Sequence, residues 1–351
     1  MSELTEGRKA DHIKVVLAED VGAKLITTGF EHLQLEHCAL PDGDLEQVDL
    51  SLELWQKKLR APVLISSMTG GTAQAQSINY RLAAVAQELG LAMGIGSQRA
   101  ALEAPHLIPT YQVRRVAPQI LLFANLGLVQ FNYGYGVEQA RQAVEMIEAD
   151  ALILHLNPLQ EAVQTGGDRR WSGLWSQLEK IVAQVTVPVI VKEVGNGISA
   201  RVARRLADCG VAAIDVAGAG GTSWSEVEAH RQTDPHARQI AHSFAGWGLP
   251  TALCLQEVVQ SLPHLPVFAS GGIRNGLEVA KAVALGATLV GSAAPFLAPA
   301  ASTPEALYQK FSGLLEELRI AAFCCGAMDL ASLREVNVYD RRTWATVPKK
   351  P

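Results

Sequence analysis

This chain has few cysteines and no hydrophobic run long enough to cross a membrane. Its five cysteines are odd in number and show no CxxC spacing, which argues against a zinc site and against a disulfide framework. The first residues are polar rather than signal-like, and no apolar stretch reaches the ~20 residues of a transmembrane helix. We therefore expect a protein of the reducing cytoplasm that makes no contact with a membrane.

Positive charge is also scarce. The chain has 30 Lys and Arg against 35 Asp and Glu, a formal net charge of −5, whereas proteins that bind nucleic acids gather basic residues. We expect no nucleic-acid partner, and any phosphate should bind at a local site. The 351 residues, 48% of them hydrophobic, suffice for one barrel with extensions or for two ordinary domains.

Short apolar segments alternate with stretches of helical spacing. The candidate strands are Pro62–Ser66, Leu91–Gly94, Ile120–Ala124, Ala151–His155, Val187–Val191, Ala212–Val216, Pro266–Ala269 and Ala287–Val290. The clearest helical patterns between them are Ala75–Leu89, Val137–Ala149, Leu174–Gln184, Ser199–Cys209 and Asn275–Leu285. This alternation predicts a parallel α/β sheet, and a spacing of about thirty residues per unit fits a TIM (β/α)₈ barrel. A doubly wound open sheet has the same periodicity and is the structural alternative.

Two loops rich in small residues near the C-terminus favour the barrel. They read ASGGIRNG over 269–276 and LVGSAAPF over 289–296. Small residues let a bound group reach backbone N–H donors, and the start of a helix adds partial positive charge. TIM barrels often build a phosphate site after strands seven and eight. We therefore expect a phosphate to bind at these loops.

The chain is expected to form a single domain. Residues 1–60 are an N-terminal extension with a small strand pair, residues 61–300 are the barrel, and residues 301–351 are a C-terminal helix and tail. The helix, over Pro304–Ala322, should pack outside the barrel. Ser223–Gly248 is longer and more polar than a connection needs, which fits a lid or a surface insertion.

The fourth candidate strand leads into the richest polar cluster, HLNPLQE over 155–161. Barrel enzymes carry their functional groups at strand ends. His155 and Asn157 share a face of an extended segment, and the bend at Pro158 brings Gln160 and Glu161 round to the same pocket. One carboxylate such as Glu161 suits Mg²⁺, which completes its shell with water and substrate phosphate. Each residue alone fits a polar loop, but together they predict a site.

Cations occur at two other places. Lys192, at the end of the fifth strand, is compatible with a Schiff base or with donation to an anionic flavin or nucleotide ring. Arg8, Lys9 and His12 lie in a segment expected to be flexible, where a solvated charge run is the simplest interpretation. If that segment folds over the barrel mouth, its cations and Arg99 are suited to binding a second phosphate group.

Taken together, several sequence blocks resemble the type 2 isopentenyl diphosphate isomerases, which are FMN-dependent barrels. The blocks are RKADH at 8–12, MTGG at 68–71, GSQR at 96–99, ANLG at 124–127, HLNPLQE at 155–161, VKEVG at 191–195, the stretch 215–224 and GGIR at 271–274. They follow in matching order from residue 8 to about 300, and HLNPLQE is the most specific. TGGD at 165–168 departs from the Pro-Glu-Gly-Asp type of sequence expected there, which leaves the local shape of that loop open.

The resemblance implies interconversion of isopentenyl and dimethylallyl diphosphates in isoprenoid biosynthesis. It implies the cofactors FMN, Mg²⁺ and NADPH, the last as reductant, and a homo-oligomer, a tetramer or octamer. The implied FMN-binding residues are Met68, Thr69, Gly70, Ser97, Asn125, Lys192, Thr222, Gly271, Gly272, Arg274, Ala293 and Ala294. The implied residues for the small-molecule diphosphate are Arg8, Lys9, His12, Ser97, Gln98, Arg99, His155, Asn157 and Gln160.

Within this resemblance Glu161 is the Mg²⁺ ligand. The proton shift passes through a carbocation-like state, and no side-chain pair in the sequence stands out as its acid and base. An electron-rich reduced flavin can stabilise positive charge and carry a proton at N5. We therefore expect FMN to act as acid and base, with Gln160 as the catalytic residue that orients the substrate.

Three other functions remain as alternatives. An FMN-dependent 2-hydroxy-acid oxidase or dehydrogenase shares the phosphate loops and the lysine, but it needs a histidine base and arginines near the late strand ends, where this chain reads AGAGGT over 217–222. A barrel like the nucleotide dehydrogenases needs a cysteine nucleophile on a strand-end loop, where none is found. A non-catalytic phosphate sensor leaves the cluster at 155–161 unexplained.

Overall fold

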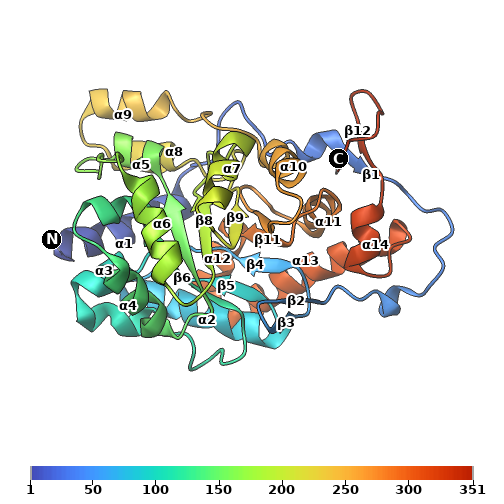
Figure 1. Ribbon diagram of the computed structural model, residues 1–351, viewed down its shortest axis with the longest axis horizontal. Coiled ribbons are helices and arrows are strands. Elements are labelled where there is room, and N and C mark those ends of the chain that lie inside the picture. The colour runs from blue at the N-terminus through green and yellow to red at the C-terminus, as the bar shows by residue number, and fades with distance from the viewer. Residues whose placement is uncertain (1, 350–351) are drawn as a thin grey trace.

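The computed structural model describes residues 2–349, with the side chains of residues 7 and 9–349. Eight parallel strands close into a barrel (Figure 1). They are β4 (Val63–Ile65), β5 (Ala92–Gly94), β6 (Leu122–Gly127), β7 (Ala151–Leu156), β8 (Val189–Glu193), β9 (Ala213–Asp215), β10 (Val267–Ala269) and β11 (Leu289–Ser292). The last strand pairs with the first, Val290 opposite Val63. Each predicted strand overlaps one of these, so the TIM barrel is confirmed and the open sheet is wrong.

The barrel is filled by apolar side chains that all eight of its strands direct inward. Its interior cluster includes Leu64, Phe123 and Phe268, each 1% exposed or less. A hairpin of the extension, β2 (Leu52–Leu54) and β3 (Lys57–Leu59), adds Leu54 and Leu59 to that cluster. This hairpin is the strand pair expected in residues 1–60, and it covers the end of the barrel core.

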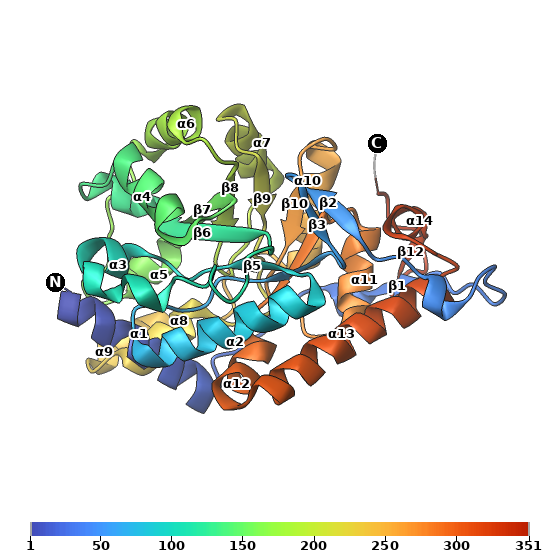
Figure 2. The same cartoon turned by 90° about the horizontal axis from the view of Figure 1, so that it is seen from below.

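Helices form the outer layer, including all five predicted from spacing. The outer helices are α2 (Ala73–Leu89), α4 (Val137–Ile147), α6 (Leu174–Gln184), α7 (Ala200–Asp208), α10 (Thr251–Ser261) and α11 (Gly276–Ala284). The short helices α3 (Arg99–Glu103) and α5 (Pro158–Val163) lie at strand ends. Beyond β11 follow α12 (Ala294–Ser302), α13 (Pro304–Cys324), α14 (Leu330–Glu335) and β12 (Val338–Asp340). The long α13 packs on α2, α11 and α12, outside the barrel as expected (Figure 2).

The N-terminal extension differs from its expected form. Residues 8–12 belong to a helix, α1 (Ser2–Ala18), where a flexible segment was expected. Ile13 is 4% exposed, and α1 packs against α3, α12 and α8 (Trp224–Arg231). These contacts hold α1 over the mouth of the barrel. Further on, β1 (Leu33–Leu35) pairs with β12, which ties the extension to the C-terminal tail.

The insertion at 223–248 also folds into helices, α8 and α9 (Pro235–His242). Helix α8 packs on α1 and α5 and so becomes part of the wall at the barrel mouth. Its mobility as a lid stays a prediction.

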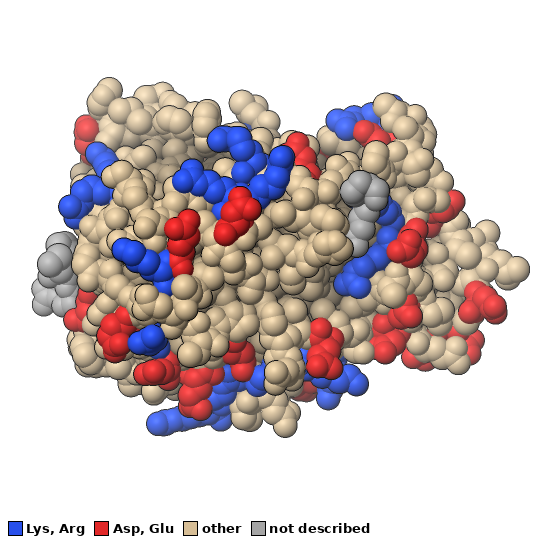
Figure 3. All heavy atoms as spheres, viewed as in Figure 1, with Lys and Arg blue, Asp and Glu red and all other residues tan. Residues whose placement is uncertain are grey.

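The distribution of charge on the surface agrees with the scarcity of Lys and Arg in the sequence. On the face seen in Figure 3, Lys and Arg side chains lie in small groups with Asp and Glu beside and between them, and they do not form one continuous basic surface. No helix within residues 2–349 is long and apolar enough to cross a membrane.

Candidate active site

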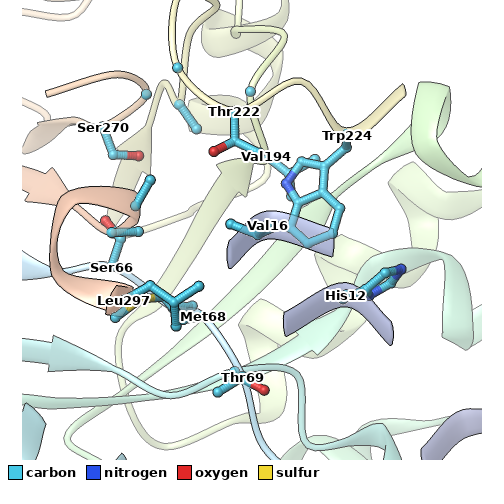
Figure 4. Close-up of a pocket in the computed structure, with 18 of the residues that line it drawn as sticks. His12, Val16, Ser66, Met68, Thr69, Val194, Thr222, Trp224, Ser270 and Leu297 are labelled. Atoms are coloured by element: carbon cyan, nitrogen blue, oxygen red, sulfur yellow. The ribbon is translucent and has the colours of Figure 1, made fainter. Parts of the chain in front are cut away.

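A cavity of about 720 Å³ lies at the carboxyl ends of the barrel strands. Residues that follow the barrel strands make its floor, and α1 and α8 cover it. In Figure 4 His12 and Val16 of α1 face the cavity beside Trp224, while Met68 and Leu297 face it from another side. The aromatic rings of His12 and Trp224 meet edge to face at 5.2 Å.

Most of the residues singled out in the sequence line this cavity. They are Lys9, His12, Met68, Thr69, Ser97, Arg99, Asn125, His155, Asn157, Gln160, Glu161, Lys192, Thr222, Gly271, Gly272, Arg274, Ala293 and Ala294. The structure thus brings together residues spread over nearly 300 positions of the chain. Their individual roles stay predictions. The side chain of Arg8 falls outside the part of the chain whose side chains the structure describes.

Gln98 and Gly70 lie behind the cavity instead of lining it. Gln98 is fully buried, its Nε2 donates to the Ala143 carbonyl at 2.8 Å, and its Oε1 accepts from the Asn125 N–H at 2.9 Å. Gln98 therefore holds the backbone of Asn125 from the side away from the cavity. A Cβ at Gly70 would overlap the ring of Tyr111. The packing of Tyr111 therefore requires glycine at position 70.

The loops after β10 and β11 form one end of the cavity. Gly271 and Gly272 have φ values of 101° and 80°, a region that glycine enters without strain. The Arg274 guanidinium donates to the carbonyls of Gly272 (3.1 Å) and Gly220 (3.3 Å). Because the first residue of α12, Ala294, presents an N–H without an intrahelical partner and the helix start carries partial positive charge, this end suits an anion. Lys310 of α13 also lines the cavity, a cation that the sequence did not reveal.

The same glycines also make room for the N-terminal extension. A Cβ at Gly220 or Gly272 would overlap Thr28. The extension runs along this loop, with the Ala23 N–H donating to the Gly221 carbonyl at 2.8 Å. Some of the glycines in these loops are therefore needed for packing against the extension. The sequence alone did not distinguish this role from ligand binding.

His155 lies opposite those loops, because β7 and β11 are four strands apart in the eight-stranded barrel. Its Nδ1 is 2.7 Å from Asn125 Oδ1, which can only accept, so Nδ1 donates and Nε2 is left as an acceptor. Burial, and then the charges of Lys192 and Lys9, lower the pKa of His155 to about 3. At neutral pH it is an uncharged imidazole.

This pKa predicts an effect of pH on stability. The unfolded chain binds a proton at His155 near pH 6.5, whereas the folded chain does so only near pH 3. The contribution of neutral His155 to the unfolding free energy is fully present above pH 6.5 and is lost as the pH falls from 6.5 towards 3. Between pH 6.5 and 5 the unfolding free energy of the protein should fall, relative to that of His155→Gln, by up to about 1.4 kcal/mol per pH unit. Urea unfolding of both proteins measures this, and parallel curves would contradict it.

Glu228 of α8 was not found from the sequence, although it links two predicted site residues. One of its oxygens, Oε1, lies 2.9 Å from His12 Nε2 and accepts from Gln160 Nε2 at 3.1 Å. The other accepts from Arg231 Nη1 at 2.6 Å. Burial opposes its ionisation, but the hydrogen bond and charge of His12 and the charge of Arg231 hold the pKa of Glu228 below its usual value. Glu228 thereby fixes Gln160 at the cavity wall.

Glu161 lines the cavity and is 6% exposed. Asn157 Nδ2 donates to its Oε1 at 3.0 Å, and the Asp168 N–H donates to its Oε2 at 2.7 Å. Among the described residues there is no group of three or more His, Cys, Asp or Glu placed to hold a metal. One carboxylate fits Mg²⁺ if water and a phosphate ligand complete its shell, but not a metal held by protein ligands alone.

Lys9 is held at the cavity by Tyr111, another residue that the sequence did not single out. Its Nζ donates to the Ser97 carbonyl at 2.6 Å and to the Tyr111 hydroxyl. That hydroxyl donates to the Ser97 carbonyl at 3.0 Å, and Tyr111 is fully buried. Burial raises the pKa of Tyr111, so the hydroxyl stays protonated.

Tyr111→Phe should therefore weaken the fixing of Lys9 while keeping the ring. We expect a loss of about 1–2 kcal/mol in unfolding free energy, the usual contribution of two hydrogen bonds, and a several-fold rise in KM for a diphosphate substrate. Urea unfolding and steady-state kinetics measure the two effects. Tyr80→Phe, on α2 and outside the cavity, is the control. Equal KM values for the two variants would show that Tyr111 does not position Lys9.

Lys192 lies on the floor of the cavity and is 8% exposed. The turn after it is fixed because Glu193 Oε2 accepts the N–H groups of Val194 and Gly195, both at 2.7 Å. Burial raises the pKa of Glu193, against these hydrogen bonds and the charge of Lys192. A rigid buried lysine suits donation to an electron-rich ligand.

The described residues that line the cavity do not supply the histidine base of a 2-hydroxy-acid oxidase or the cysteine nucleophile of a nucleotide dehydrogenase. The histidines that line the cavity, His12 and His155, come from α1 and β7, and none of its described lining residues after β8 to β11 is a histidine. No cysteine is among the described lining residues either. Burial raises the pKa of the Cys254 thiol to about 12 and that of Cys325 to about 11, so these thiols are poor nucleophiles.

Comparison with known proteins agrees with this site. Residues 137–340 match the FMN-dependent dehydrogenase family. An isopentenyl-diphosphate delta-isomerase of Synechocystis sp. is 66% identical and covers 98% of this chain and 99% of its own. The protein of the same name from Stutzerimonas stutzeri is 56% identical, with 94% and 96% covered.

Solved structures share the fold at much lower identity. A mandelate oxidase mutant with (S)-mandelic acid is 19% identical with a TM-score of 0.64, and the match covers 96% of this chain and 97% of that one. This similarity supports the barrel and does not favour an oxidase. With two relatives more than half identical over almost its whole length, the chain belongs to the isopentenyl-diphosphate delta-isomerase family.

Proposed function

We propose that this chain interconverts isopentenyl and dimethylallyl diphosphates with bound FMN. The observation that carries the proposal is a single cavity with two separate polar ends. The anion site after β10 and β11 lies across the barrel from the polar cluster after β7. One end suits the FMN phosphate and the other a substrate diphosphate.

The residues at the glycine end fit FMN. Gly271 and Gly272 leave the backbone open, while Arg274 and the start of α12 supply positive charge. Lys192, which lines the floor of the cavity, would donate to the flavin ring. Reduced FMN supplies an electron-rich ring and a proton at N5.

The other end fits a diphosphate with Mg²⁺. Lys9 and Arg99 supply positive charge, whereas His155, which is neutral and has Nε2 as an acceptor, adds none. Glu161 would hold Mg²⁺ by one carboxylate, with the diphosphate as a further ligand. The diphosphate must provide most of the binding energy, because the hydrocarbon part of the substrate has no polar group.

Between the two ends the wall is apolar. Val16, Met68, Trp224 and Leu297 line it (Figure 4). An apolar wall excludes water from the alkene, and Gln160, held by Asn157 and Glu228, orients it for the proton shift. No oxidant is needed, since the reaction has no net redox change.

Three finer parts of the proposal remain, of which the reductant and the assembly rest on the family alone and the cytoplasmic location on the cysteine usage. NADPH would keep FMN reduced, the protein would act in the cytoplasm, and it would assemble as a homo-oligomer, a tetramer or octamer. Reduction by NADPH is checked by bleaching of the flavin spectrum, and assembly by light scattering.

The experiment is direct. Purified protein with FMN, NADPH and Mg²⁺ should convert isopentenyl diphosphate to dimethylallyl diphosphate by proton NMR, and omission of the reductant should stop it. A flavin analogue that cannot carry a proton at N5 should bind without supporting turnover. Oxidation of lactate-type acids in place of isomerisation would favour the 2-hydroxy-acid oxidase.

A further inference from the structure

One residue of the loop at 165–168 touches both the proposed metal ligand and a proposed diphosphate ligand. The N–H of Asp168 donates to Glu161 Oε2 at 2.7 Å. Its carboxylate accepts from Arg99 Nη1 at 2.6 Å and from Gln130 Nε2 at 2.9 Å. Backbone and side chain of Asp168 thus connect Glu161 to Arg99, although Asp168 does not line the cavity.

The loop that carries Asp168 is fixed from several sides. The Gly167 N–H donates to the Gln164 carbonyl at 3.1 Å, and Trp171 Nε1 donates to the Asp168 carbonyl at 3.1 Å. A Cβ at Gly167 would overlap the Glu161 carbonyl. The close approach of this loop to α5 therefore needs glycine at 167. This is also the loop that departs from the family pattern in sequence.

Arg99 remains able to bind a ligand while Asp168 holds it. Its Nε donates to Glu103 at 2.7 Å and its Nη1 to Asp168. Its remaining nitrogen, Nη2, is left for an oxygen in the cavity that Arg99 lines. Because a guanidinium is a rigid fork, fixing two of its nitrogens fixes the direction of the third.

We propose that Asp168 is the positioning residue of the diphosphate site. Its carboxylate directs Arg99 and its backbone N–H directs Glu161, so the two face the same metal-bound diphosphate. This inference rests on the proposed function. Because Glu103 and Asp168 offset the charge of Arg99 and Glu161 adds a negative charge, Lys9 alone would not balance the charge of a diphosphate. The diphosphate would therefore bind as its Mg²⁺ complex.

The test is binding of inorganic pyrophosphate to the FMN-loaded protein by calorimetry, over a series of Mg²⁺ concentrations. Asp168→Ala removes the carboxylate and keeps the N–H. We expect it to weaken pyrophosphate binding about tenfold, as for the loss of a charged hydrogen bond, with an unchanged requirement for Mg²⁺. Asp168→Asn keeps one acceptor oxygen and should lie between. In turnover, KM should rise and kcat should change little.

Gly167→Ala tests the hydrogen bond from the Asp168 N–H to Glu161. It should move the Asp168 N–H away from Glu161 and raise the Mg²⁺ concentration needed for pyrophosphate binding. FMN content and circular dichroism establish that each variant is folded. If Gly167→Ala does not fold, Asp168→Ala decides alone.

The outcomes separate the two proposals. Unchanged or tighter pyrophosphate binding by Asp168→Ala would overturn the positioning role, tighter binding showing that Asp168 only repels the ligand. Equal effects of Asp168→Asn and Asp168→Ala would also overturn it, because charge alone would then explain them. If the unaltered protein neither binds pyrophosphate with Mg²⁺ nor isomerises the substrate, the proposed function itself fails.

Discussion

Gln160→Leu is expected to lower kcat for isomerisation about 100-fold, the usual cost of losing alignment at a reacting centre, while FMN stays bound. The Gln160 carboxamide is held at both ends. Its Oε1 accepts from Asn157 Nδ2 at 3.1 Å, and its Nε2 donates to Glu228 Oε1 at 3.1 Å. Leucine has a similar volume but neither contact. Single-turnover and steady-state kinetics on the reduced holoenzyme measure the effect.

Two further variants sharpen the Gln160 result. Gln142→Leu makes the same change on the exposed surface of α4 and should leave kcat unaltered. Gln160→Glu places a carboxylate beside Glu228, where it cannot donate unless protonated, so its activity should recover partly as the pH is lowered. If Gln160→Leu raises KM and keeps kcat, Gln160 only binds the substrate and does not orient it in the reaction.

The barrel could be predicted because its signal is repetitive. Each unit supplies an apolar strand and an amphipathic helix, so one misjudged element would not change the fold. The cluster at 155–161 was found for a local reason: one strand end and the helix after it carry all its polar residues. His155 and Asn157 share a face of the chain, and α5 brings Gln160 and Glu161 to the same cavity.

The missed residues depend on contacts between distant segments. Glu228 looks like one charge in a polar insertion, and only the packing of α8 on α1 and α5 brings it to His12 and Gln160. Tyr111 acts through Lys9, 102 positions away. The family resemblance implied that Gln98 binds the substrate, but the turn into α3 directs its side chain behind Asn125. Such three-dimensional relations leave no periodic pattern in the sequence.

Gly271→Ala is expected to weaken FMN binding at least about 100-fold, the effect of removing several phosphate contacts together. Gly271 has a φ of 101°, and a Cβ there would lie 2.6 Å from Gly218 N and overlap the Gly218 carbonyl. Alanine must therefore separate the loops after β9 and β10, both of which line the cavity. The strained backbone should also cost about 1–3 kcal/mol of stability. Fluorescence titration of FMN into apoprotein and thermal unfolding measure the two effects.

Gly313→Ala is the matched control for this loss. Gly313 lies within α13, and a Cβ there would meet nothing within 4 Å. Alanine should stabilise that helix by about 1 kcal/mol and leave FMN affinity unchanged. Normal FMN binding by Gly271→Ala, together with its lower stability, would mean that these glycines serve only the packing of loops and extension. The phosphate would then have to bind elsewhere in the cavity, nearer Lys310 and the start of α12.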